Sequence, residues 1–182
     1  MTGRSLFKKL DKISWLFYPI CKVNIYLDKI NGVFANLQIV LRYYKFRLLF
    51  KSTGTNVSIH NKVIIKHPEN INIGSNVSIH PLCYLDAEGN IEIGNNVSIA
   101  HNTTILSSNH TWQDPATPIK YNPKSYSDVI IEDDVWIGCG VRIMGGVRIR
   151  KRCVIAAGAV VTKECKSNAL YAGVPARFIK AI

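Results

Sequence analysis

The chain has 182 residues, 47% hydrophobic and 19% charged, which is typical of a globular protein and excludes a largely disordered one. Its net charge of +11 is uneven: residues 1–51 carry ten Lys or Arg against two Asp, a balance of +8, and the remaining 131 residues carry only +3. Because the basic excess is confined to one segment, the charge does not favour nucleic acid as a partner.

No targeting segment or membrane span is predicted. Residues 1–19 lack an uninterrupted apolar core followed by a small-residue cleavage site, which argues against a signal peptide. No run of about 18 apolar residues predicts a spanning helix. The five cysteines form no CxxC pair, so free thiols are favoured over disulfides or a zinc site. These features predict a cytoplasmic protein.

Residues 1–52 are predicted to form a basic, amphipathic helical segment. From Leu6 to about Phe50 the apolar residues recur at three- and four-residue spacing, which indicates two or three helices broken near Pro19 and Gly32. Two interpretations stay open. The segment is either a cap packed on the main domain or on a sister subunit, or a basic surface within residues 1–51 that makes peripheral contact with the inner face of a membrane.

A strict repeat follows. The phrase GTNVSIH at residues 54–60 returns as GSNVSIH at 74–80 and as GNNVSIA at 94–100, twenty residues apart each time. Branched aliphatic residues recur in steps of six, with one step of eight per turn before residue 105 and none after residue 131. They are Ile59, Ile65, Ile73, Ile79, Leu85, Ile93, Ile99, Ile105, Ile131, Ile137, Ile143, Ile149, Ile155 and Val161.

A step of six is too long for one face of an amphipathic helix and too regular for hairpins. Each six-residue unit can supply one short strand and one corner, so that three units close a triangular coil with its aliphatic side chains stacked inside. Small residues such as Gly74, Gly138 and Ala156 follow the aliphatics, where a corner leaves little room for a side chain. The repeat therefore predicts a mainly β coil.

These six-residue units, for example residues 73–78 (IGSNVS) and 137–142 (IGCGVR), resemble those of the hexapeptide-repeat acyltransferases. The resemblance implies a left-handed parallel β-helix over residues 53–182, with a CoA-binding C-terminal end. Three stretches are similar to the closing section of the maltose/galactoside O-acetyltransferase branch, which sugar O-acetyltransferases of surface-polysaccharide clusters share: DVWIGCGVRIMGGV (134–147), VIAAGAVVTK (154–163) and AGVPARFIK (172–180).

The repeat breaks once. After Ile105 the next corner aliphatic is expected near position 113, but it arrives at Ile131. The extra residues, about 111–128, contain three prolines and are predicted to leave the coil as a loop. His110 directly precedes this loop, at the position where the resembling enzymes have their general base. A neutral imidazole suits removal of a hydroxyl proton near neutral pH.

The acceptor side is predicted around the same break. The resemblance implies an acceptor contact at His80, although an outward-facing strand residue is the simpler interpretation. Asp86 and Glu88 are expected to bind sugar hydroxyls or to orient His110, and Trp112 to line the acceptor site. Asp114 is a further candidate for orienting the imidazole, whereas His67 and His101 are taken as surface residues.

The donor side is predicted near the C-terminus, where the resemblance implies that acetyl-CoA is the acyl donor. The expected contacts are Trp136, Cys139, Ala157, Thr162, Lys163, Arg177 and Lys180. The cations suit the phosphates of the nucleotide, and backbone N–H groups around residues 138–140 suit the oxyanion. Cys139 lacks a neighbouring base that would make it a nucleophile. No spacing argues for a metal, and neither GxGxxG nor GxxxxGK occurs.

The sequence thus predicts a homotrimeric, acetyl-CoA-dependent O-acetyltransferase that acts on a sugar hydroxyl in a surface polysaccharide (capsule or O-antigen) intermediate. Two alternatives stay open: an antibiotic O-acetyltransferase of the same fold, and a noncatalytic β-helix that assembles with partners. A sugar N-acetyltransferase is disfavoured because residues 1–52 are too few for a separate nucleotide-sugar domain.

Overall fold

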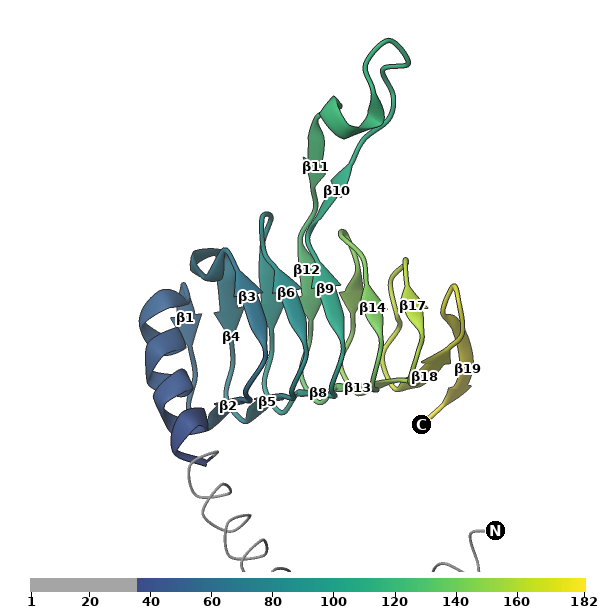
Figure 1. The fold of residues 1–182 in the computed structure, drawn as a ribbon. Helices are drawn as coiled ribbons and strands as arrows, with labels where there is room; N and C mark the ends of the chain where they lie inside the picture. Colours follow the sequence, from purple (N-terminus) through teal and green to yellow (C-terminus); the bar gives the residue numbers. More distant parts are fainter. Residues whose placement is uncertain (1–35) are drawn as a thin grey trace, which may run out of the picture. The chain divides into compact units, whose positions relative to one another are not determined.

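The computed structural model describes residues 36–182. The chain divides into two compact units, residues 1–38 and 39–182, and every strand of the described residues lies in the second. The helices predicted before residue 36 lie outside the described residues. Residues 36–49 form a helix, as expected, and the buried rings of Phe46 and Phe50 stack at a centroid distance of 5.4 Å and join the hydrophobic core. This helix covers one end of a β coil (Figure 1).

Three sheets form the coil within the described part of the chain, and their strands run parallel except for the last pair of the second sheet, which is antiparallel (Figure 1). The first sheet contains β1 (Ser52–Thr53), β4 (Ile71–Ile73), β7 (Ile91–Ile93), β12 (Val129–Ile131) and β15 (Arg148–Ile149). The second contains β2 (Val57–Ile59), β5 (Val77–Ile79), β8 (Ser98–Ile99), β13 (Trp136–Ile137), β16 (Cys153–Ile155), β18 (Ala169–Ala172) and β19 (Arg177–Ala181). The third contains β3 (Ile64–Lys66), β6 (Tyr84–Asp86), β9 (Thr104–Leu106), β14 (Arg142–Ile143) and β17 (Val160–Val161).

The chain visits the three sheets in rotation, one strand in each per turn, which confirms the predicted left-handed parallel β-helix. We number the turns 1 to 5 from β1 to β17 and name the corners by the sheets that they join: 1–2, 2–3 and 3–1. The paired residues confirm the two turn lengths: Asn72 pairs with Glu92, twenty residues on, and Arg142 pairs with Val160, eighteen residues on. A short η1 helix (Pro68–Asn70) lies at the first 3–1 corner.

The stacked aliphatic side chains fill the coil as predicted. All fourteen residues of the repeat series are buried except Ile65, which is only partly buried because turn 1 lies at the end of the coil. Burial of a side chain of this size contributes about 1.5–3 kcal/mol. The stack therefore supplies most of the driving force for folding, and strands of two or three residues suffice because each inner strand is hydrogen-bonded to a strand of the turn on either side.

The repeated phrase that begins with Gly and continues with Asn-Val-Ser is explained at the 1–2 corner. A Cβ on Gly74 would lie 2.7 Å from the carbonyl oxygen of Gly94 in the next turn, so glycine is required by the close approach of successive turns. Asn76 adopts a positive φ of 59°, a conformation that Asn tolerates better than most residues. Its side chain also accepts a hydrogen bond from Asn56 at 2.9 Å and donates one to Asn96 at 3.0 Å. The sequence analysis identified the corner but not this ladder.

The predicted loop is a projecting arm that leaves the 3–1 corner between turns 3 and 4 (Figure 1). It begins slightly earlier than residue 111, because β10 (Ser108–His110) pairs antiparallel with β11 (Lys124–Tyr126). The segment beyond them contains η2 (Ile119–Tyr121). The buried side chain of Asn122 holds this segment together by donating to the carbonyl oxygens of Thr117 at 2.8 Å and Asp114 at 3.3 Å.

Candidate functional site

The arm is fixed to the coil by a polar contact at its root. Glu88, at the 3–1 corner of turn 2, accepts hydrogen bonds from Lys124 Nζ at 2.6 Å and from Ser108 Oγ at 2.8 Å. One donor lies on each strand of the arm, so Glu88 ties both strands to the coil. The hydrogen bond from Lys124, followed by that from Ser108, lowers the pKa of the Glu88 carboxyl. Glu88 was predicted to contact the acceptor; the structure gives it this structural contact as well.

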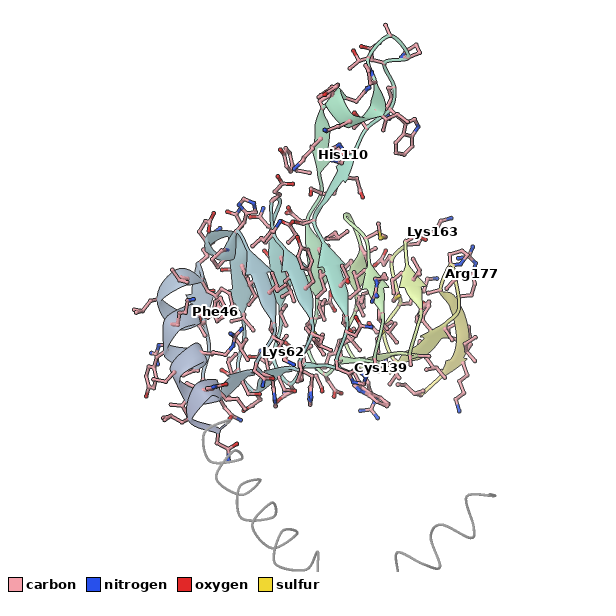
Figure 2. The ribbon with its side chains drawn as sticks, viewed as in Figure 1. Phe46, Lys62, His110, Cys139, Lys163 and Arg177 are labelled. Carbon is pink, nitrogen blue, oxygen red and sulfur yellow. The ribbon has the colours of Figure 1, made fainter. Side chains whose placement is uncertain are left out.

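His110 lies on the arm, directly opposite Lys124 in the antiparallel pair. Its side chain is exposed and stands clear of the coil (Figure 2). Asp114, considered as its orienting partner, accepts hydrogen bonds from the Thr117 hydroxyl at 2.6 Å and the Ala116 amide at 2.9 Å instead. These bonds stabilise a turn at the far end of the arm and lower the pKa of Asp114. Trp112 is 67% exposed nearby in sequence and lines no pocket among those within the described residues.

A polar cluster lies on the coil near the root of the arm. Asp86, at the end of β6, accepts a hydrogen bond from the Tyr84 hydroxyl at 3.1 Å, and His67 Nε2 lies 4.0 Å from the other carboxylate oxygen. That oxygen, Oδ1, is buried and has no hydrogen-bond partner among the described residues. A buried acceptor without a partner is energetically costly, which makes this oxygen an exception among the polar groups of the coil.

His80 is separated from this cluster. It lies at the 2–3 corner, and its ring stacks on His60 at a centroid distance of 4.9 Å, one turn earlier. Burial and, after it, the charge of His80 lower the pKa of His60. A single chain therefore brings Asp86 and Glu88 to the corner that carries the arm, but places His80 at a different corner.

An apolar groove runs along the second sheet to the 2–3 corner of turns 4 and 5, with a volume of about 470 Å³. It contains three of the residues that were predicted to contact acetyl-CoA: Trp136, Cys139 and Ala157. Trp136 is 56% exposed and offers its ring as one wall. The sequence analysis missed His101 and Leu170, which also line the groove; their positions in the repeat, one turn before Cys139 and one turn after Val154, are the signal that identifies them.

The floor of this groove carries free backbone donors. The N–H groups of Gly138 and Gly140 are used within the coil, where they donate to Ile155 and His101 carbonyl oxygens. By contrast, the N–H groups of Cys139 and Ala157 have no acceptor within residues 36–182. Of the backbone N–H groups that were predicted as oxyanion donors around residues 138–140, the N–H of Cys139 is therefore the one that remains available. The N–H of Ala157 occupies the same position one turn later.

The 2–3 corner changes its chemistry along the coil. In turns 1 to 3 its positive-φ position is occupied by Lys62 (57°), Leu82 (64°) and Asn102 (59°). In turns 4 and 5 it is occupied by Gly140 (69°) and Gly158 (72°), and a Cβ on either glycine would meet no atom within 4 Å. Crowding therefore does not require these glycines, and they leave the backbone open beside the groove.

The predicted cationic residues lie elsewhere on the coil. Thr162 and Lys163 follow β17 at the 3–1 corner, and Figure 2 shows Lys163 and Arg177 on the side of the coil opposite Cys139. Lys180 lies on β19, where it pairs with the groove residue Leu170. One chain therefore holds the predicted donor contacts in two places, at the groove and along the opposite edge.

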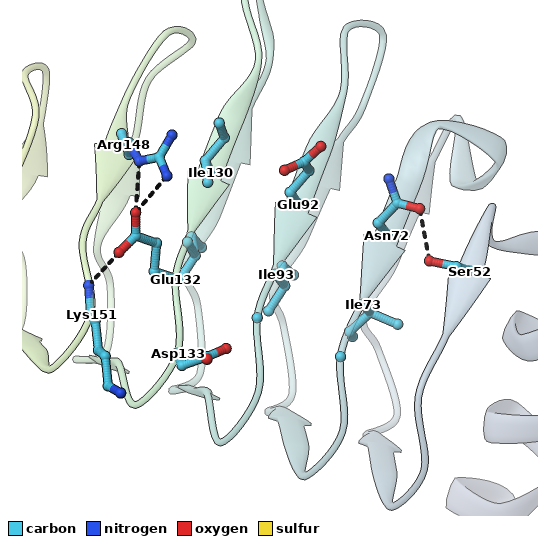
Figure 3. A pocket seen from close by; sticks show the side chains of 13 residues that line it. Ser52, Asn72, Ile73, Glu92, Ile93, Ile130, Glu132, Asp133, Arg148 and Lys151 are labelled. Atoms are coloured by element: carbon cyan, nitrogen blue, oxygen red, sulfur yellow. Dashed lines mark hydrogen bonds and ion pairs between the residues drawn. The ribbon is translucent and has the colours of Figure 1, made fainter.

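A second hollow, of about 570 Å³, lies on the outer face of the first sheet and contains none of the predicted residues (Figure 3). Its polar contacts include one ion pair, between Glu132 and Arg148. Glu132 accepts hydrogen bonds from Arg148 at 2.7 Å and from the Lys151 backbone N–H at 2.9 Å, and Ser52 donates to Asn72 at 2.7 Å. We assign this hollow no ligand.

The described residues offer neither a metal site nor a membrane-spanning helix. Within residues 36–182 no group of three or more His, Cys, Asp or Glu side chains is arranged to hold a metal ion. No helix in that range is both long and apolar enough to cross a bilayer. The four cysteines described, Cys83, Cys139, Cys153 and Cys165, are free thiols, as expected. Burial raises the pKa of Cys165 to about 12, whereas Cys139 is only partly buried.

Comparison with known proteins extends these observations. The family model described as bacterial transferase hexapeptide (six repeats) matches residues 128–163. The structure of a maltose O-acetyltransferase from Clostridium difficile 630 is similar over 86% of this chain and 84% of its own, with 32% identity and a TM-score of 0.71. The chain belongs to the hexapeptide-repeat acyltransferases.

Two further structures of this family contain the cofactor. A galactoside acetyltransferase in complex with coenzyme A is 31% identical, with a TM-score of 0.73 over 77% of this chain and 69% of its own. A hexapeptide-repeat-containing acetyltransferase from Vibrio cholerae O1 biovar eltor, complexed with acetyl coenzyme A, is 29% identical, with a TM-score of 0.73 over 78% of this chain and 76% of its own.

Curated relatives match over a shorter region. A 2,3,4,5-tetrahydropyridine-2,6-dicarboxylate N-acetyltransferase from Staphylococcus aureus is 52% identical over 58 residues, which is 32% of this acyltransferase. The match spans only 24% of the length of that relative. It therefore supports the coil and carries little information on the acceptor.

Proposed function

We propose that this hexapeptide-repeat acyltransferase transfers acetyl from acetyl-CoA to a hydroxyl of a sugar, in a capsule or O-antigen intermediate. The observation that carries the proposal is the apolar groove at the glycine-bearing corner, which gathers Trp136, Cys139 and Ala157 from two successive turns. Its apolar lining suits the thioester arm of CoA, and the open N–H groups of Cys139 and Ala157 suit carbonyl oxygens.

The cationic residues suit the other end of the donor. Lys163, Arg177 and Lys180, with the Thr162 hydroxyl, offer charges and hydrogen-bond donors for the nucleotide phosphates. Two solved relatives whose structures contain CoA or acetyl-CoA support this choice of donor. We therefore assign the C-terminal turns to the donor.

The reaction needs one base. His110 accepts the proton of the acceptor hydroxyl while its oxygen attacks the thioester carbon. The tetrahedral oxyanion is stabilised by the backbone N–H of Cys139. When the C–S bond breaks, the imidazolium returns the proton to the departing CoA thiolate. No covalent acetyl-enzyme is formed, and no described hydrogen bond links the Cys139 thiol to a basic side chain.

A second copy of the chain completes this site. His110 lies on an arm at the 3–1 corner, whereas the groove opens at the 2–3 corner of the same coil (Figure 2). The arm of one copy and the groove of another must therefore come together, and a homotrimer provides three such sites. The exposed Trp112 and Tyr121 on the arm offer apolar surface for this contact.

The acceptor is placed beside the arm root. Asp86 and Glu88, whose side chains are partly exposed, offer carboxylate oxygens to sugar hydroxyls. His80 joins them from a neighbouring copy, since it lies at a different corner of its own coil. This polar surface favours a polyhydroxyl acceptor over an apolar antibiotic. The similarity to a maltose O-acetyltransferase over 86% of this chain supports oxygen as the acceptor atom.

The proposal is tested by release of CoA thiol from acetyl-CoA with a panel of acceptors: simple sugars, nucleotide sugars, lipid-linked glycans and chloramphenicol-type antibiotics. We expect release with a glycan, and a loss of about 100- to 10,000-fold in His110→Gln. The control Lys62→Gln, at an exposed corner of turn 1, should retain activity. Release with an antibiotic alone would replace the glycan assignment, and failure to bind acetyl-CoA would favour a noncatalytic β-helix.

A further inference from the structure

The helix that covers the end of the coil has an apolar stripe that the coil does not use. Val40, Leu41, Tyr44 and Leu48 lie on one face at three-, four- and eight-residue spacing, and each is at least half exposed. Leu48 is 87% exposed. Isolated exposed leucines need no explanation, but a continuous stripe on one helix face indicates a contact.

The opposite face of the same helix is already occupied. Phe46 and Phe50 are buried in the core, and Arg42 donates a hydrogen bond to the Val63 carbonyl oxygen at 2.8 Å. These contacts fix the rotation of the helix about its own axis, so that the stripe faces away from the coil. Figure 2 shows Phe46 between the helix and the coil.

Basic side chains border the stripe. At 3.6 residues per turn, Lys45 lies along one edge of the stripe and Arg47 along the other. Both are exposed, and Lys51 follows the helix. No Asp or Glu occurs between residues 36 and 51. An apolar stripe bordered by cations without any acid is the pattern of a helix that lies in the interface of an anionic bilayer.

We propose that this stripe docks the protein on a membrane surface rich in anionic phospholipid. Leucine side chains enter the boundary between headgroups and acyl chains, Tyr44 lies at headgroup level, and Lys45 and Arg47 contact lipid phosphates. Turn 1 of the coil then faces the membrane, and the coil extends away from it. The stripe is short, so the contact is reversible.

Charge separates this occupant from a second copy of the chain. Two copies that met through the stripe would bring Lys45, Arg47 and Lys51 of one copy close to those of the other, with no carboxylate on either helix to pair with them. Like charges across an interface disfavour association. An anionic lipid surface satisfies both the stripe and its border. The inference rests on the helix of residues 36–49 alone and does not depend on the proposed acetyl transfer.

The test is co-sedimentation of the full chain with vesicles of phosphatidylcholine alone or with an equal part of phosphatidylglycerol. We expect binding to the anionic vesicles only, weakened by added salt. The double variant Leu41→Ser/Leu48→Ser should weaken binding by about tenfold or more, and Lys45→Gln/Arg47→Gln on the order of tenfold. The matched control is Leu82→Ser, which removes a similarly exposed leucine from the coil and should bind as wild type.

Several results would overturn the inference. Equal binding to neutral vesicles would show that the cations do not contribute to binding. No binding of the wild type to either kind of vesicle would show that the stripe is not a membrane-docking surface. Light scattering of the same variants tests whether a second copy of the chain occupies the stripe. If Leu41→Ser/Leu48→Ser reduces the size of the oligomer, the stripe is a subunit contact. Acetyl transfer to a soluble acceptor, measured in parallel, shows whether the catalytic proposal stands or fails separately.

Discussion

The early and late turns of the coil share one backbone geometry at the 2–3 corner and differ in the residue that occupies it. Turns 1 to 3 place Lys62, Leu82 and Asn102 at the left-handed position, whereas turns 4 and 5 place Gly140 and Gly158 there at nearly the same φ. The fold thus accepts a side chain at this position. We infer that the late glycines serve a ligand, because they border the apolar groove and have open space around them.

The contrast with the 1–2 corner sharpens this point. There, Gly74 is required by contact between turns, since its Cβ would lie 2.7 Å from the Gly94 carbonyl oxygen. These glycines therefore have two different causes: close packing at Gly74, and also at Gly138 beside the groove, but open space at Gly140 and Gly158. Their substitutions should separate into effects on stability and effects on donor binding.

The largest effect is expected from filling the groove. Ala157→Trp places a large ring where the CoA arm is proposed to lie, so the KM for acetyl-CoA should rise on the order of 100-fold. The side chain is exposed, so the melting temperature should change little. The control is Asn61→Trp, at the equivalent position of turn 1. An equal loss in both variants would break the distinction between early and late turns.

Next in size is the packing glycine. Gly74→Ala should lower the free energy of unfolding by about 1–3 kcal/mol, because its Cβ overlaps backbone that cannot move aside. Gly140→Ala meets no atom and has only the cost of a positive φ, about 1 kcal/mol. Urea unfolding of both variants measures the difference. Equal destabilisation would show that the two corners do not differ in packing.

A smaller effect is expected from giving the late corner the side chain of an earlier one. Gly158→Asn copies Asn102, which adopts a φ of 59° at the same corner of turn 3. Because Asn tolerates this φ there, the free energy of unfolding should fall by no more than about 1 kcal/mol. The amide would project beside the groove and raise the KM for acetyl-CoA by about tenfold. The reverse change, Asn102→Gly, should leave the KM unaltered. An unchanged KM in Gly158→Asn would mean that the glycine serves only the backbone.

The smallest effect concerns Cys139, which is partly buried in the groove. In a Cys21→Ser background it should be the first of the remaining thiols to react with a maleimide, since Cys83, Cys153 and Cys165 are buried and burial raises their pKa values. Saturating CoA should slow that reaction several-fold. Labelling that CoA does not slow would place the cofactor outside the groove.

Much of the fold followed from the sequence because the repeat is a physical period. Residues that share a position in successive turns share a corner or an inward site, so the buried isoleucines could be assigned before any coordinates existed. Cys139 and Ala157 were assigned to the donor site by the family resemblance, and the repeat identifies His101 as a third member of their row. The interruption at His110 was equally visible, because a strict period makes any insertion stand out.

The arm itself has no period, and there the predictions were less complete. The antiparallel register that sets His110 opposite Lys124 depends on how the intervening residues fold, and Asn122 at their centre is fixed by contacts that no motif announces. The bond from Lys124 to Glu88 joins residues 36 apart and was missed for the same reason. Nor could the sequence show that His110 and the groove lie at different corners.

The most direct test of the account is steady-state CoA release by the full chain, measured for the wild type, His110→Ala and Ala157→Trp with the same acceptor. The account predicts a split: His110→Ala lowers kcat with little change in the KM for acetyl-CoA, and Ala157→Trp raises that KM. Subunits of the two variants that are denatured and refolded together should recover part of the activity at low acetyl-CoA, since an arm and a groove from different copies then form an intact site. Both variants losing kcat alone, with no recovery on refolding together, would contradict it.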